Sequence, residues 1–144
     1  MSILGNRVAR REDPAFLAGG GVYVADLDLD DEAHLVYVRS DVAHGRITSI
    51  DTSGAERAPG VVGVFQASDI GDLGLAPHVL PVFPEATKRH FLAADTVRYV
   101  GEPVVAVLAD TYAQAVDAAE LVFVEYEALP AGVDVEAAAR DETL

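Results

Sequence analysis

The sequence contains no cysteine at any of its 144 positions. The chain therefore cannot form a disulfide, bind a metal through a thiolate or ligate an iron–sulfur cluster by itself. A protein without disulfides suits the reducing interior of the cell, so we expect a cytoplasmic location. Long apolar runs are also missing, because none approaches the roughly 20 residues that a membrane-spanning helix requires. We therefore expect no membrane partner.

Basic residues are scarce. Ten lysines and arginines stand against 24 aspartates and glutamates, which gives a net charge of −14, and Lys88 is the one lysine. Proteins that bind nucleic acid or anionic lipid need clustered positive charge to contact phosphates. The composition thus argues against both kinds of partner. Hydrophobic residues make up 51% of the chain, which fits a globular protein of one domain over residues 1–144.

The stretch from 97 to 129 predicts the core of this domain. Residues 104–109 read Val-Val-Ala-Val-Leu-Ala and follow a Gly-Glu-Pro turn, a pattern typical of a strand buried on both faces. The capping box Thr-x-x-Gln at 111–114 starts a helix, and alternation at 122–127 predicts another strand. This strand–helix–strand unit carries no chemistry, and we interpret Glu102 as a turn residue.

The rest of the chain predicts short elements of both kinds. Apolar runs and alternating patterns predict further strands at 22–25, 35–39, 47–50 and 61–65. Start signals predict short helices from Asp13-Pro14, from a capping box at Ser53-Gly54-Ala55-Glu56 and at 136–140. The expected class is α+β, with a mixed sheet and two main short helices.

Two features resemble metal sites, and neither fits one. Aspartates alternate at positions 26–30, but Asp31 occupies the place of the glycine in a calcium-binding EF-hand loop and Tyr37 that of its final glutamate. A solvated strand end explains this pattern better. His44 has no second histidine, cysteine or carboxylate at metal spacing, so we predict a loop histidine bonded to the backbone. We expect no metal-binding residue.

Residues 71–90 lack any regular pattern. Prolines at 77, 81 and 84 exclude an interior strand, yet the segment is too apolar for an ordinary solvated loop. Two interpretations stay open: the segment packs on something outside the chain, or it folds back over its own core. The candidates for an inter-domain or substrate-approach contact are Val79, Leu80, Val82 and Phe83.

Four runs, in order, carry a resemblance to a known family. They are Arg39–Ile47 with Ile50-Asp51, Pro59–Val64, Val97–Val104 continuing to Ala109-Asp110, and Ala115–Ala131 with its Val-Glu-Tyr-Glu. Together they resemble the N-terminal α/β-hammerhead domain of the molybdenum-binding large subunit of xanthine dehydrogenases, aldehyde oxidases and aerobic carbon monoxide dehydrogenases. The opening Gly5–Val8 with Arg11–Asp13 looks like the carbon monoxide dehydrogenase branch. The family usually has Ser-Pro where this chain has Asp41-Val42, in a surface loop.

The resemblance implies an oxidoreductase that inserts a water-derived oxygen at a carbon centre. It implies a molybdopterin cofactor, with FAD and [2Fe–2S] clusters on partner subunits or domains. In the family the catalytic glutamate and the pterin-binding loops lie downstream, so no catalytic or cofactor-binding residue can be assigned to 1–144. We expect a non-catalytic domain, inactive alone and part of a longer subunit, that packs against the remaining molybdenum domains.

The main alternative is a free-standing binding or scaffold protein that has the hammerhead fold. The absence of any paired acid and base argues against a third possibility, an enzyme in its own right. The residues that would choose among carbon monoxide, an aldehyde or an N-heterocycle as substrate lie downstream in the family. Two observations distinguish the first two possibilities. For a domain of a longer subunit we expect the gene to continue beyond Leu144 and the isolated chain to expose an apolar face, and for a free-standing protein we expect neither.

Overall fold

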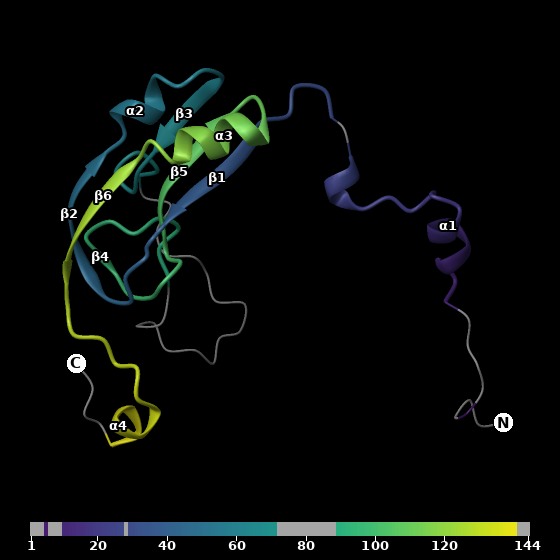
Figure 1. Ribbon diagram of the computed structural model, residues 1–144. Helices are drawn as coiled ribbons and strands as arrows, with labels where there is room; N and C mark the ends of the chain where they lie inside the picture. The colour runs from purple at the N-terminus through teal and green to yellow at the C-terminus, as the bar shows by residue number, and fades with distance from the viewer. Residues whose placement is uncertain (1–4, 6–9, 28, 72–88, 141–144) are drawn as a thin grey trace. The chain divides into compact units, whose positions relative to one another are not determined.

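A computed structural model describes residues 5, 10–27, 29–71 and 89–140 of the chain (Figure 1). The chain divides into two compact units, residues 1–32 and 33–144, which are described separately below. Val79, Leu80, Val82 and Phe83 lie outside the described residues, so the predicted contact segment stays a prediction. Within the described residues, no helix has the length and apolar character needed to cross a membrane.

The first unit contains helix α1 (Asp13–Leu17) and a 3₁₀ turn, η1 (Val24–Asp26). The sequence predicted Asp13 as the cap of this helix, but α1 begins at Asp13 itself and Glu12 is the N-cap residue, without a side-chain cap bond. Pro14 stands in the first turn, as expected. The expected strand at 22–25 is wrong. The carboxylate of Asp26 accepts the backbone N–H of Tyr23 at 2.9 Å, and this local bond favours a tight turn over extended chain.

The second unit contains two three-stranded sheets, which we call sheet A and sheet B (Figure 1). Sheet A has the order β1 (His34–Arg39), β5 (Pro103–Ala109), β3 (Val61–Phe65). Sheet B has the order β4 (Thr96–Val97), β2 (Gly45–Asp51), β6 (Phe123–Ala128). All of these pairings are antiparallel.

The α+β class and the strands of the second unit agree with the expectation, but the grouping of these strands differs. The strand–helix–strand unit does not place its strands side by side, because β5 lies in sheet A and β6 in sheet B. Helix α3 (Tyr112–Ala119) connects them and packs on β1 and β5 (Figure 1). Apolar periodicity indicates which residues are buried and does not specify the partner of each strand.

The core lies where α3 and α2 (Ser53–Glu56) meet the strands. β5 contributes more of it than any other element, in line with its apolar run, and its valines are fully buried. Small residues let the helices approach closely. The fully buried members of this cluster are Ala55, Val97, Val104, Val105, Val107 and Ala118.

The helix starts differ in detail from the predicted capping boxes. Thr111 caps α3 by accepting the N–H of Gln114, but the Gln114 side chain returns to the Thr111 hydroxyl instead of the backbone. In α2 the capping residue is Thr52, one position earlier than predicted. Its hydroxyl donates to Glu56 at 2.6 Å, while the N–H of Ser53 is bound by Asp51. The last helix, α4, spans Val135–Ala139.

Candidate functional site

The turn between β4 and β5 is held by a buried carboxylate. Strand β4 ends at Val97, and residues 98–102 form the turn that leads into β5. Glu102 is 2% exposed, and its carboxylate accepts the backbone N–H of Arg98 at 2.5 Å. The Arg98 guanidinium lies 4.0 Å from the same carboxylate. Glu102 is therefore a turn residue, as predicted, and its buried charge is satisfied within the turn.

The same turn is bound to the end of β1. Gly101 donates its N–H to the carbonyl of Ser40 at 2.7 Å, and Ser40 donates to the carbonyl of Glu102 at 2.9 Å. Gly101 has a φ of +92°, a conformation in which glycine is favoured. The Arg39 side chain donates to the Gly101 carbonyl at 2.8 Å. These bonds fix the turn against sheet A.

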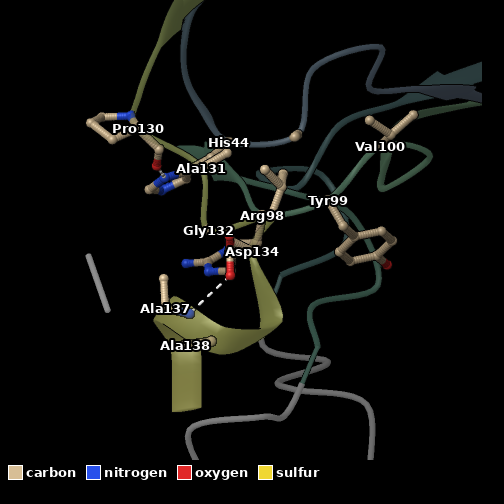
Figure 2. Close-up of a pocket in the computed structure, with 12 residues that line it drawn as sticks. His44, Arg98, Tyr99, Val100, Pro130, Ala131, Gly132, Asp134, Ala137 and Ala138 are labelled. Carbon is tan, nitrogen blue, oxygen red and sulfur yellow. Dashed lines mark hydrogen bonds between the residues drawn. The ribbon is translucent and has the colours of Figure 1, made fainter. Parts of the chain in front are cut away.

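Beside this turn lies a hollow of about 620 Å³ (Figure 2). Its walls come from the loop at 43–44, from the turn at 98–100 and from residues 130–138, which include α4. Figure 2 shows the His44 ring beside the Pro130 carbonyl, and the ring nitrogen Nδ1 lies 2.6 Å from the carbonyl oxygen. His44 is therefore a loop histidine bonded to the backbone, as the sequence predicted.

The charged side chains of the hollow, Arg98 and Asp134, are engaged within the protein. Asp134 accepts the N–H of Ala137 at 2.9 Å and so caps α4, as the dashed line in Figure 2 marks. Arg98 donates to the carbonyl of Thr96 at 3.0 Å. The remaining lining is mostly small and apolar. No nucleophile and base face each other among these lining residues, so the hollow has no arrangement for acid–base or covalent catalysis.

Among the described residues, the phenol of Tyr126 and the carboxylate of Asp51 have shifted pKa values, and both shifts have structural causes. Burial raises the pKa of Tyr126 on β6, the hydrogen bond with Ser40 acts in the opposite direction, and the charge of Asp41 adds to the increase. The pKa of Asp51 is lowered, chiefly by the N–H of Ser53 at 2.9 Å. Asp51 is exposed at the end of β2, and the shift of each group follows from its own structural neighbours.

The described residues do not fit a metal or a pterin. Among them no three histidine, cysteine, aspartate or glutamate side chains gather as metal ligands would. In this part of the chain every buried polar side-chain atom already has a hydrogen-bond partner, so none awaits a partner from a cofactor. We therefore derive no catalytic step from these residues.

Sequence reasoning identified Glu102 and His44 individually and missed the hollow that lies beside them. Its walls come from three segments far apart in the sequence, at 43–44, 98–100 and 130–138. None of these segments has a distinctive pattern on its own. The tie between Arg39 and Gly101, 62 positions apart, was missed for the same reason.

Comparison with known proteins assigns this fold to a class. The sequence profile described as "Aldehyde oxidase and xanthine dehydrogenase, a/b hammerhead domain" matches residues 18–130. In structure, the chain is similar to quinoline 2-oxidoreductase from Pseudomonas putida 86, with a TM-score of 0.82 and 41% identity over 99% of this chain and 18% of that one. The fold is thus an α/β-hammerhead.

Curated relatives give the same result. The chain is 43% identical to the nicotine 6-hydroxylase large subunit of Paenarthrobacter nicotinovorans, over 92% of this chain and 16% of that protein. It is 40% identical to the carbon monoxide dehydrogenase large chain of Afipia carboxidovorans, over 91% and 16%. The chain belongs to the aldehyde oxidase and xanthine dehydrogenase hammerhead family, and it spans about a sixth of the length of these relatives.

Proposed function

We propose that this chain serves as the hammerhead domain of a molybdopterin-dependent hydroxylase large subunit and performs no chemistry itself. The observation that carries the proposal is the ordered match of 92% of the chain to only 16% of the nicotine 6-hydroxylase large subunit. In such a subunit the domain packs against the molybdenum domains. FAD and [2Fe–2S] clusters on partner subunits or domains receive the electrons.

In this proposal the domain is an acidic, structural part of the large subunit. Its buried turn, its hollow and its pKa shifts all have structural explanations within the described residues. Relatives named for nicotine, quinoline and carbon monoxide are 43%, 41% and 40% identical to the chain. Similarity in this domain therefore follows the shared fold and not the substrate. The cytoplasmic location expected from the cysteine-free sequence stays a prediction.

Sequencing the gene beyond codon 144 tests the proposal. We expect the reading frame to continue through molybdopterin-binding domains. A stop codon soon after Leu144, in a gene with no such domains beside it, would instead support the free-standing binding or scaffold protein. Separately, turnover of an aldehyde or purine by the purified 144-residue chain would contradict the proposed absence of chemistry.

A further inference from the structure

The unusual feature of sheet A is that neither of its faces has the composition of a surface exposed to water. The face toward α3 contributes Val36, Val38, Val64, Val105 and Val107, which are buried or partly buried. Antiparallel sheets with one solvated face normally alternate apolar and polar residues along each strand. The three strands of sheet A show no such alternation, because their opposite face is apolar as well.

The side chains on that opposite face, which we call the outer face, form two rows across the strands. Strand register places residues directly opposite one another on the same face of a sheet. The rows are Tyr37–Ala106–Phe65 and Leu35–Leu108–Gly63. The Phe65 ring lies over Gly63, where an added Cβ would come within 2.7 Å of it. The outer face is therefore a continuous apolar surface.

Much of this surface is accessible in the structure. Leu35 is 46% exposed, Tyr37 39% and Phe65 38%. Single exposed apolar side chains are ordinary on protein surfaces, but a contiguous group of them marks an interaction site. The exposed members lie on the two edge strands, β1 and β3, and between them on β5 Leu108 is partly buried and Ala106 is 7% exposed.

The strands of sheet A also carry fewer charged side chains than those of sheet B. None of the 24 acidic residues lies in β1, β3 or β5, although the chain has a net charge of −14. Sheet B has the composition of a solvated sheet. There, Arg46 pairs with Glu127 at 2.8 Å, and Ser49 donates to Glu125 at 2.8 Å.

The outer face carries a single charged group, Arg39, at the end of β1. Its guanidinium lies over the Tyr37 ring, 5.4 Å from the ring centre, and is held by the Gly101 carbonyl at 2.8 Å. An arginine has five N–H donors, so a partner carboxylate or carbonyl can bind beside the existing contact. The face is complementary to an apolar surface with an acceptor oxygen at its edge.

We propose that the outer face of sheet A, formed by Leu35, Tyr37, Phe65 and Leu108 with Arg39 at its edge, is where the remaining polypeptide of the large subunit packs. This inference rests on the proposed function. In the solved relatives the matched domain is only 16–18% of the chain, so most of the polypeptide lies outside it. A second copy fits less well. The three strands offer no carboxylate to pair with the Arg39 of a second copy, and each chain carries a net charge of −14.

The absence of cysteine allows a direct test. The substitutions Leu35→Cys and Phe65→Cys each introduce one thiol on the outer face, on two different strands. Phe123→Cys, on β6 of sheet B where the native side chain is 65% exposed, is the matched control. Maleimide labelling at each position is measured by peptide mass spectrometry, once in the 144-residue chain and once in the large subunit expressed from the complete gene. Peptide-level detection keeps any other cysteines of the large subunit separate.

We expect rapid labelling at all three positions in the 144-residue chain. In the large subunit we expect labelling at positions 35 and 65 to slow about tenfold or more, because buried thiols do not react, while position 123 changes little. Circular dichroism of each variant verifies the fold, and two positions on separate strands keep the test valid if one variant fails to fold.

Three results would overturn the proposal. The first is equal labelling rates at positions 35 and 65 in the chain and in a molybdenum-containing large subunit. The second is slow labelling at positions 35 and 65 already in the 144-residue chain. If this protection increases with protein concentration, a second copy covers the face. If it does not, the chain's own residues cover it. The third is equal slowing at position 123. Failure of the proposed function is a separate result, because the gene then encodes no molybdenum-binding domains.

Discussion

Glu102 closes the turn before β5 by accepting the backbone N–H of Arg98 at 2.5 Å with a carboxylate that is only 2% exposed. The turn in turn binds Ser40 through two backbone hydrogen bonds. The Glu102 side chain thus closes the turn after β4, and the backbone of the same turn connects the end of β1 to the start of the central strand of sheet A.

Replacing Glu102 is expected to destabilise the fold. Glu102→Ala leaves the Arg98 N–H without its buried acceptor, which should lower the free energy of unfolding by about 3 kcal/mol. Glu102→Gln keeps an acceptor oxygen and should cost about 1 kcal/mol. Urea denaturation followed by circular dichroism measures both. Glu125→Ala, on the exposed edge of sheet B, is the control, and an equal loss there would show that Glu102 has no special role.

Val107 lies fully buried at the centre of sheet A, between Val36 and Val64 in neighbouring strands. Val107→Ala removes buried methyl groups and leaves a cavity, so we expect a loss of about 2–3 kcal/mol in the free energy of unfolding. Val62→Ala, at an exposed bulge position of β3, should change it by less than about 0.5 kcal/mol. Comparable losses in the two variants would contradict the assigned core.

Gly60 precedes β3 with a φ of +76°, and a Cβ there would come within 2.3 Å of the Gln114 side chain. Gly101 has a φ of +92° and open space around it. Gly101→Ala should therefore lower the free energy of unfolding only by the strain of an alanine at positive φ, about 1–2 kcal/mol. Gly60→Ala should lose about 0.5–1 kcal/mol more, because Gln114 must leave its contact with Thr111.

A double-mutant cycle separates these terms. In a Gln114→Ala background the extra cost of Gly60→Ala should disappear and match that of Gly101→Ala. Thermal or urea unfolding of the variants supplies the free energies. Persistence of the extra cost without Gln114 would mean that another contact opposes the new methyl group.

Burial raises the pKa of Tyr126 above its ordinary value of 10.0. Because the folded-state pKa is the higher one, the contribution of the neutral phenol to stability is fully present below about pH 10 and is lost as the pH rises through the folded-state pKa. Tyr126→Phe should reduce this alkaline loss of stability. Urea midpoints measured at increasing pH test it, and an unchanged slope in Tyr126→Phe would refute the assignment.

The sequence predicted the elements better than their arrangement, for physical reasons. The strand at 104–109 and the helix after Thr111 were found because burial imposes an apolar run on one and a capping residue marks the other. The strand at 22–25 was wrong because the Asp26 side chain competes with extended structure, a contact that apolar patterns do not encode.

The pairing of the strands and the hollow could not be predicted from the sequence, for a different reason. Assignment of β5 and β6 to separate sheets depends on contacts between distant segments, which single-strand periodicity does not contain. The hollow beside His44 likewise combines three separated segments, none with a motif of its own. The family resemblance supplied the fold because its four runs, taken in order, carry that long-range information.

The central claim is that this chain is one domain of a molybdenum hydroxylase large subunit. The most direct test is to isolate the native protein from the cells that produce it, with an antibody against the 144-residue chain, and to measure its mass and its molybdenum content by elemental mass spectrometry. Because the chain covers 16% of nicotine 6-hydroxylase, we predict a polypeptide about six times as long with bound molybdenum. A free polypeptide of 144 residues with no associated molybdenum would contradict the account.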